Sequence, residues 1–214
     1  QGASMGVHES QSRIYENQLG RSRAFCEFLF GHMKQSFSDF GIQTPDAFYK
    51  AVNSVGNGFI RTEADEVQYN LHVLLRFDLE RALVSGDLQV KDLETAWNDR
   101  FYSDFGYQVN CASQGCLQDV HWSVGLFGYF PTYSLGNVYA GCLYETLRKN
   151  CPTLDNDLRV GNLSPATDWL RDSLQCHGAL KLPRKTISDA CGFEPSEEPL
   201  LAYLQGKFSD IYDL

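Results

Sequence analysis

The stretch from Gly115 to Ala140 reads GCLQDVHWSVGLFGYFPTYSLGNVYA, and the rest of the chain is interpreted around it. An amide, a carboxylate, an imidazole and an indole fall within five residues, from Gln118 to Trp122. Two phenylalanines, three tyrosines and one proline follow before the stretch ends. A helix that only packs a core does not need these polar groups side by side, and a plain loop does not need so many aromatic rings. We therefore interpret the stretch as the lining of a polar pocket.

The same stretch predicts two helices with a break between them. The first is expected over residues 117–127 and the second over residues 133–147. Pro131 cannot continue a helix without losing a backbone hydrogen bond, so we expect the interruption across residues 128–131.

Start and stop signals predict helices in the remaining sequence. Thr44 is a hydroxyl cap followed by a proline in the first turn, and Thr62 with Asp65 has the pattern of a capping box. About eight to ten helices without a β-hairpin signal indicate one all-α domain over residues 6–214. The expected helices are 9–19, 21–40, Thr44 to Val52, the Thr62 box to about Val84, 93–105, 117–127, 133–147, Asn162 to Cys176, 187–190, and Ser196 through Ile211.

Composition narrows the class of protein. The 214 residues are 43% hydrophobic and 21% charged, which is ordinary for a globular protein with a real core. The net charge of −9 offers no basic surface for phosphates and argues against nucleic-acid binding. The sequence contains no run of about 18 apolar residues, so it predicts no membrane-spanning helix. Residues 1–5, QGASM, are interpreted as a tag remnant and a start methionine, and no signal peptide is recognised.

Seven cysteines occur, and their number and spacing decide between several kinds of site. The count is odd and no CxxC pair is present, which argues against a zinc ribbon and against a disulfide framework. We expect reduced thiols, mostly buried as small apolar groups, in a cytoplasmic protein.

Familiar catalytic motifs are missing from the sequence. None of the five histidines has a second histidine four residues further on, so the helical HExxH zinc site does not occur. A GxSxG elbow, a P-loop and a GxGxxG loop are absent as well. The residues alone predict a polar pocket around five side chains but not a complete catalytic set: Gln118, Asp119, His121, Tyr129 and Tyr133.

Each of these residues also has a plain structural interpretation. His121 suits hydrogen bonding to a developing oxyanion, with Asp119 fixing a histidine tautomer, but it equally suits a satisfied core histidine beside a packing tryptophan. Arg61 suits a bidentate carboxylate clamp or a solvated surface charge. His8 and Glu9 suit the start of a helix with an acid near its positive end.

Three separated segments nevertheless resemble, in order, three motifs of one family. They are HESQSR at residues 8–13, IRTEAD at residues 60–65 and GCLQDVHW at residues 115–122. The family is that of the Taq-type (thermostable carboxypeptidase) metallocarboxypeptidases. The sequence between the motifs agrees too, for instance EVQYNLHVLLRFDLE at residues 66–80, and the resemblance covers residues 6–214.

The resemblance implies an all-α zinc peptidase that removes single residues from peptide C-termini and commonly forms homodimers. Its fold is related to those of angiotensin-converting enzyme and neurolysin. By motif match, Glu9 is implied to be the third metal ligand, to zinc or to cobalt in its place. Arg61 is implied to bind the substrate carboxylate, with Gln118 and Asp119 on the same substrate side. His121, with either Tyr129 or Tyr133, is implied to stabilise the tetrahedral intermediate.

One departure from the family shapes the expected function. Its members are much longer, and they carry HExxH and DxRxT motifs ahead of the HES motif. Because those residues are not in this sequence, we expect the chain to be the C-terminal portion of the enzyme, to hold no zinc alone and to be inactive alone. Its expected partners are a peptide C-terminus, the N-terminal half and a second copy. The alternative is a non-catalytic truncated homologue that acts by binding or dimerisation.

Overall fold

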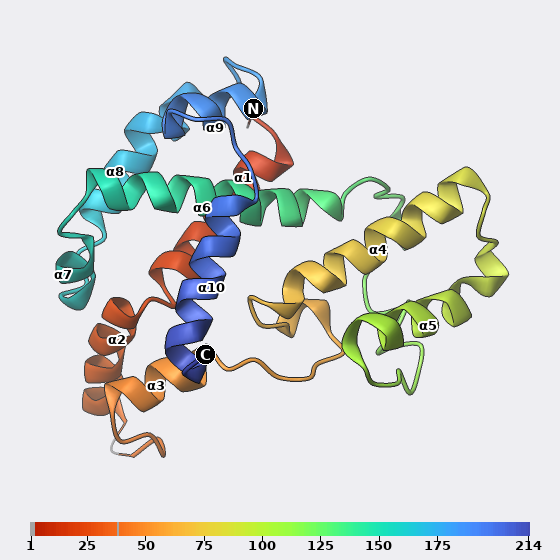
Figure 1. Ribbon diagram of the computed structural model, residues 1–214, viewed down its shortest axis with the longest axis horizontal. Helices are drawn as coiled ribbons and strands as arrows, with labels where there is room; N and C mark the ends of the chain where they lie inside the picture. The colour runs from red at the N-terminus through yellow and green to blue at the C-terminus, as the bar shows by residue number, and fades with distance from the viewer. Residues whose placement is uncertain (1–2, 38) are drawn as a thin grey trace. The chain divides into compact units, whose positions relative to one another are not determined.

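The computed structural model describes residues 3–37 and 39–214, and every regular element in these ranges is a helix (Figure 1). The expected all-α class is therefore confirmed. Gln1 and Gly2 of the expected tag remnant lie outside the described residues. Ser4 and Met5 do take part in the fold, because the Ser4 hydroxyl caps the helix that begins at Met5 and accepts the backbone N–H of Val7 at 3.1 Å. The tag interpretation itself stays a prediction.

Ten α-helices lie in the described part of the chain. Their bounds are α1 Met5–Arg13, α2 Arg23–Ser36, α3 Pro45–Val52, α4 Gln68–Ser85, α5 Leu93–Phe105, α6 Pro131–Asn150, α7 Leu154–Arg159, α8 Ser164–Ser173, α9 Pro183–Cys191 and α10 Glu198–Tyr212. A π-helical turn over Ile14–Leu19 continues α1, and 3₁₀ turns occur at Arg61–Glu63, Val90–Asp92, Trp122–Val124 and Gln175–His177.

The helices form two compact units. Unit 1 comprises the described residues up to Ser54 together with Leu135–Leu214, and unit 2 comprises Val55–Ser134. The single domain expected for residues 6–214 stays a prediction, and each unit has apolar clusters of its own. All of α4 and α5 belongs to unit 2, and α6 begins in unit 2 and continues into unit 1.

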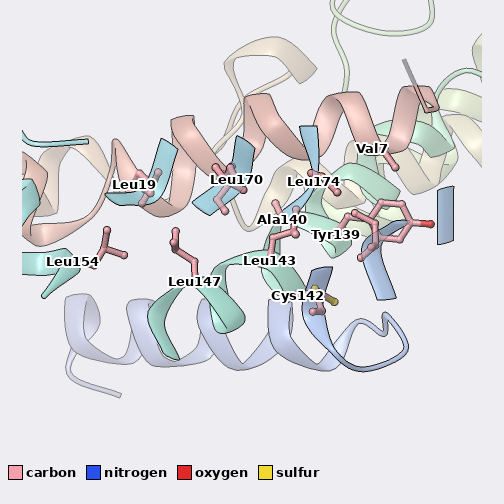
Figure 2. Close-up of a cluster of buried hydrophobic side chains, with 14 of the residues drawn as sticks. Val7, Leu19, Tyr139, Ala140, Cys142, Leu143, Leu147, Leu154, Leu170 and Leu174 are labelled. Carbon is pink, nitrogen blue, oxygen red and sulfur yellow. The ribbon is translucent and has the colours of Figure 1, made fainter. Parts of the chain in front are cut away.

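The core of unit 1 is built along α6. Leu143 and Leu147 from this helix are fully buried, and Figure 2 shows them among side chains contributed by several other helices. Full burial of one leucine side chain stabilises a fold by about 1.5–3 kcal/mol, so this cluster is the main cohesive element of the unit. Its other labelled members are Val7, Leu19, Tyr139, Ala140, Cys142, Leu154, Leu170 and Leu174.

Gly141 lets α6 approach the first turn of α10 closely. A Cβ atom at this position would lie 2.8 Å from the backbone nitrogen and Cα of Leu200. Backbone atoms cannot turn aside as a flexible side chain can, so the absence of a side chain at Gly141 sets the distance between the two helices.

Several helix boundaries follow the local signals, and others do not. Thr44 caps α3 as expected, with its Oγ1 accepting the N–H of Ala47 at 3.1 Å. Gly106 ends α5 as expected, in the left-handed conformation with φ of 82°. The prediction of a capping box that begins at Thr62 is wrong. Asp65 instead caps the start of α4, because its Oδ1 accepts from the N–H groups of Val67 and Gln68, both at 2.9 Å.

The prediction of a helix over residues 117–127 is also wrong. This segment consists of turns around the 3₁₀ turn Trp122–Val124. Gly125 and Gly128 have φ of +78° and +73°, a conformation that is incompatible with a continuing right-handed helix. Pro131 is the first residue of α6 rather than a break before it, a position where its missing N–H is not needed.

The cysteines are less uniformly buried than the sequence suggests. All seven are free thiols, and three of them, Cys26, Cys142 and Cys191, are buried. Burial raises the pKa of Cys26 to about 11 and that of Cys191 to about 12, so both are neutral packing groups. Cys111 and Cys176 are exposed.

Unit 2 packs α4 against α5 around aromatic side chains. Trp97 and Phe101 from α5 are buried against Leu75 and Leu79 from α4. His72 is buried in the same place, with its ring centroid 4.6 Å from that of Phe105. Burial, with the nearby charge of Arg76, lowers the pKa of His72 to about 3, so this histidine is neutral in the folded protein.

Two glycines of unit 1 predict opposite effects of the same substitution. Gly141→Ala should destabilise the fold by about 1–3 kcal/mol through overpacking against Leu200. Gly206→Ala should stabilise it by about 0.5–1 kcal/mol, because Gly206 lies inside α10 and the added methyl group would have nothing within 4 Å to clash with. Urea unfolding of both variants measures the difference. Equal effects of the two substitutions would contradict the close packing of α6 on α10.

The burial of His72 predicts a loss of stability in acid. An unfolded histidine takes up a proton as the pH falls through 6.5, whereas folded His72 stays neutral down to about pH 3. The unfolded state therefore binds more protons in this window, and stability falls by about 2 kcal/mol by about pH 5 from this group alone. Urea unfolding at neutral pH and at about pH 5 tests this. The acid loss should be smaller in His72→Leu, and an unchanged pH dependence in that variant would refute the assignment.

Candidate functional site

The candidate site residues divide between the two units. Glu9 belongs to unit 1, and the other six lie in unit 2. Within unit 2, hydrogen bonds join Arg61, Gln118 and Asp119 into one network, and His121 and Tyr133 into a second pair. The residues for which the resemblance implies a role toward substrate thus all belong to unit 2, and Glu9, the implied metal ligand, belongs to unit 1.

Asp119 is bound between two buried arginines. Its Oδ1 accepts from Nη2 of Arg61 at 2.6 Å, and its Oδ2 accepts from Nε of Arg76 at 2.6 Å. Nε of Arg61 adds a further bond to Oδ1 at 3.2 Å, so that guanidinium grips the carboxylate with two nitrogens. Arg61 also donates from Nη1 to the hydroxyl of Tyr69 at 3.1 Å. The interpretation of Arg61 as a solvated surface charge is therefore wrong.

The charges of this triad shift the pKa of each member. Burial raises the pKa of Asp119, but the hydrogen bond from Arg61 and the charges of Arg76 and Arg61 outweigh it, so this pKa lies below its usual range. Burial lowers the pKa of Arg61, and Asp119 more than compensates. Arg76 is so deeply buried that its pKa falls to about 10 despite Asp119. All three groups are charged at neutral pH, and together they carry one net positive charge.

Gln118 holds two backbone segments together. Its side-chain nitrogen donates to the carbonyl oxygens of Phe59 at 2.9 Å and Gln114 at 2.8 Å. Its side-chain oxygen accepts the backbone N–H of Arg61 at 2.8 Å. The amide thereby fixes the 3₁₀ turn that carries Arg61 against the loop that carries Asp119. Its expected contact with substrate stays a prediction.

His121 is paired with Tyr133 rather than with Tyr129. Nε2 of His121 lies 3.0 Å from the Tyr133 hydroxyl, within hydrogen-bonding distance. The ring of Tyr129 packs beside both, with centroids 5.3 Å from His121 and 5.4 Å from Tyr133. The guanidinium carbon of Arg61 lies 4.8 Å from the centroid of the Tyr133 ring, so the positively charged triad is in direct contact with this pair.

The surroundings of His121 keep it neutral. Burial is the main cause of its lowered pKa, and the charges of Arg61 and Arg76 act in the same direction against the opposing effect of Asp119. Nδ1 lies 3.8 Å from Oδ1 of Asp119, which is beyond hydrogen-bonding distance, and it is buried with no hydrogen-bond partner among residues 3–37 and 39–214. A neutral imidazole can donate one proton and accept another, so the ring can work with the tyrosine hydroxyl as a proton-sharing pair.

Glu9 is fixed by close packing within unit 1. A Cβ atom on Gly136 would lie 2.7 Å from both Cβ and Cγ of Glu9, so the bare backbone of α6 provides the space that the Glu9 side chain fills. Nε of Arg13, one turn further along α1, donates to Oε1 of Glu9 at 2.8 Å. The neighbouring His8 is exposed.

The described residues do not by themselves form a metal site. A zinc ion in a protein takes at least three ligands from His, Cys, Asp or Glu side chains. No group of three such residues is close enough together among residues 3–37 and 39–214. Glu9 can supply one carboxylate, and one of its oxygens already accepts from Arg13. A metal bound at Glu9 would need further ligands beyond those that the described residues bring together.

Sequence patterns did not single out two charged residues of this network, both on α4. Arg76 binds Asp119, and Glu80 accepts from the indole Nε1 of Trp122 at 2.7 Å. His72, Arg76 and Glu80 follow one another at intervals of four residues, so they share one face of α4. That polar stripe within an apolar segment was a readable signal for a buried network.

No helix in the described part of the chain has the length and apolar character to cross a bilayer.

Comparison with known proteins places this geometry in a family. Residues 1–208 match the carboxypeptidase Taq (M32) metallopeptidase family. The chain is 42% identical to thermostable carboxypeptidase 1 of Thermus thermophilus over 209 residues, which are 98% of this chain and 41% of that protein. It is 39% identical to carboxypeptidase 1 of Bacillus subtilis over 215 residues, covering 99% of this chain and 42% of the relative.

Solved structures agree with the sequence comparison. The M32 carboxypeptidase of Deinococcus radiodurans R1 superposes with a TM-score of 0.95 and 40% identity, over 100% of this chain and 43% of that one. Metallocarboxypeptidase 1 of Trypanosoma cruzi gives a TM-score of 0.92 with 35% identity, over 97% and 44% respectively. The chain thus spans about two fifths of the length of the relatives it matches. On both sequence and fold, it belongs to the carboxypeptidase Taq (M32) metallopeptidase family.

Proposed function

We propose that this chain supplies the substrate and transition-state side of a metallocarboxypeptidase that hydrolyses the last peptide bond of its substrates. The observation that carries the proposal is the His121–Tyr133 pair, joined at 3.0 Å and backed by a positively charged triad. Peptide hydrolysis develops negative charge on the former carbonyl oxygen, and fixed donors near positive charge stabilise it. Membership of the family supplies the reaction class.

The His121–Tyr133 pair can present one proton to such an oxyanion. With the imidazole proton on Nε2, His121 donates to the oxygen of Tyr133, and in this proposal the tyrosine hydroxyl donates its own proton to the oxyanion. The positive charge of Arg61 behind the tyrosine ring favours this donor role. In this proposal Tyr133 is the oxyanion donor and His121 positions it, while Tyr129 packs beside them.

The carboxylate-binding role expected for Arg61 stays a prediction. Asp119 already occupies the fork of its guanidinium that a substrate carboxylate would use, and Tyr69 binds Nη1. This arrangement favours a role as a fixed positive charge at the substrate side. Asp119 and Gln118 then hold Arg61 in place instead of touching substrate themselves.

The metal belongs to the proposal as well. Zinc, or cobalt in its place, would be held by Glu9 together with ligands from outside this sequence, and the chain alone would be inactive. We further propose a cytoplasmic enzyme that pairs with a second copy of itself. A non-catalytic homologue that acts by binding is the competing function, and a complementation experiment separates the two.

Complementation tests the proposed function. The chain should be inactive alone, and it should release C-terminal residues from peptides when it is mixed with the part of the Bacillus subtilis relative that it does not match. In the active mixture, Tyr133→Phe should lower kcat by about 100-fold or more, because one oxyanion donor is lost. Tyr129→Phe should lower it much less. Tyr102 is exposed, so the variant Tyr102→Phe serves as the matched control.

Three results would contradict parts of this proposal. Activity of the chain alone would show that its own residues suffice. Absence of activity in every mixture whose parts associate would favour the non-catalytic binding function. A larger effect of Tyr129→Phe than of Tyr133→Phe would transfer the donor role to Tyr129.

The donor set predicts weak metal retention. After exposure to zinc and dialysis, the chain should keep well below one equivalent, because one glutamate cannot replace three ligands. Metal analysis by mass spectrometry measures the ratio. A Cys111→Ser/Cys176→Ser variant controls for adventitious binding by the exposed thiols. Near-stoichiometric zinc that persists in this variant and disappears in Glu9→Gln would show a complete site.

A further inference from the structure

Glu80 is a buried carboxylate that binds two separate parts of one loop. It lies on α4 and is 5% exposed. Its Oε2 accepts the indole N–H of Trp122 at 2.7 Å, and its Oε1 accepts the backbone N–H of Gly128. Both carboxylate oxygens are therefore engaged, each by a different end of the segment between residues 122 and 128.

The rest of that segment is attached to unit 2 mainly through Trp122, whose ring packs edge-on against Trp97 and Phe130 at centroid distances of 6.3 and 5.7 Å. The intervening residues 123–127 are all exposed, including the apolar Val124, Leu126 and Phe127. Trp122 and Phe127 line an apolar hollow of about 440 Å³, so Phe127 does not fill a packed core. The loop has internal bonds, such as the N–H of Leu126 to the carbonyl of His121 at 2.8 Å, which fix its local turn. The Glu80 carboxylate adds hydrogen bonds from α4 to both ends of the turn, beside the packing of Trp122.

The two ends of this loop lead directly into the candidate catalytic rings. His121 immediately precedes Trp122, and Tyr129 immediately follows Gly128. The rings of His121 and Tyr129 lie 5.3 Å apart, and Phe130 packs on His121 with a centroid distance of 4.4 Å. A change in the separation of Trp122 from Gly128 would shift these rings relative to one another and to Tyr133.

We propose that Glu80 is a positioning residue, whose carboxylate clamps Trp122 and Gly128 and so fixes His121 relative to Tyr129 and Tyr133. The catalytic part of this inference rests on the function proposed above, and the clamp itself does not. Glu80 acts through the loop and does not touch substrate.

The clamp requires two acceptors, which makes the carboxylate chemically specific. A glutamate has two acceptor oxygens and no donor, which suits one indole N–H and one backbone N–H. A glutamine of the same shape has one acceptor, and its NH₂ group would face the second donor. Glu80→Gln must therefore lose one of the two bonds while it preserves the size of the side chain.

Hydrogen exchange measured by NMR tests the clamp in the 214-residue chain. In Glu80→Gln, at least one of the two protons, the Trp122 indole or the Gly128 amide, should exchange about tenfold faster, as expected for loss of one charge-assisted hydrogen bond. Asp78→Asn is the matched control, since it removes another acid of α4 that pairs with Arg100 at the surface. Unchanged exchange of both protons in Glu80→Gln would overturn the proposal.

A second variant separates the clamp from a general loss of stability. In Trp122→Phe the indole donor is gone, so one acceptor suffices and Glu80→Gln should no longer accelerate exchange at Gly128. Equal acceleration at Gly128 with and without the indole would mean that the carboxylate acts only on overall stability, and would refute the clamp.

Activity in the complemented enzyme tests the positioning. Glu80→Gln should lower kcat about tenfold or more with KM nearly unchanged, whereas Asp78→Asn should change neither. A clamp seen by exchange together with unchanged kcat would remove the catalytic role of Glu80. If no mixture is active, the proposed function fails, and the exchange measurements still decide whether the clamp exists.

Discussion

The ion-paired triad of Asp119 with Arg61 and Arg76 is the interaction on which the candidate site depends. Desolvating three charges is unfavourable, and removing one partner from such a group typically costs about 3–5 kcal/mol because a buried charge is left uncompensated. Here one carboxylate serves two guanidinium groups, so it fixes the 3₁₀ turn of Arg61, the loop of Asp119 and the helix of Arg76 at one point. The residual positive charge then acts on His121 and Tyr133.

Helix α4 organises this region because its buried face is polar as well as apolar. Arg76 binds Asp119, and Glu80, one turn later on the same face of the helix, binds Trp122 and Gly128. His121 lies between these two attachments in the sequence, so both ends of its segment are fixed to the same rigid helix. A helix can hold two anchors at a constant separation, which a loop cannot do.

Local signals in the sequence predicted the fold better than they predicted the site. The cap at Thr44 and the stop at Gly106 depend only on neighbouring residues, and both were right. The helix over residues 117–127 failed because the pattern of polar and apolar residues does not reveal that Gly125 takes a positive φ. Arg61 could not be recognised as buried, because its partner Asp119 is 58 residues away in the sequence. The pairing of His121 with Tyr133 rather than Tyr129 likewise depends on a distance that spacing alone does not give.

The two units differ in how many of the contacts needed by the proposed site they contain. In unit 2, the hydrogen bonds and ring contacts described for the His121–Tyr133 pair come from residues between Phe59 and Tyr133. In unit 1, Gly136 and Arg13 place the Glu9 carboxylate, but the chemistry of a metal requires ligands that no described neighbour provides. The proposed donor pair is thus preorganised within this chain, whereas the described residues do not bring three metal ligands together. The proposed donor pair, rather than the proposed metal ligand Glu9, is therefore the part of the candidate site whose geometry the described residues define most completely.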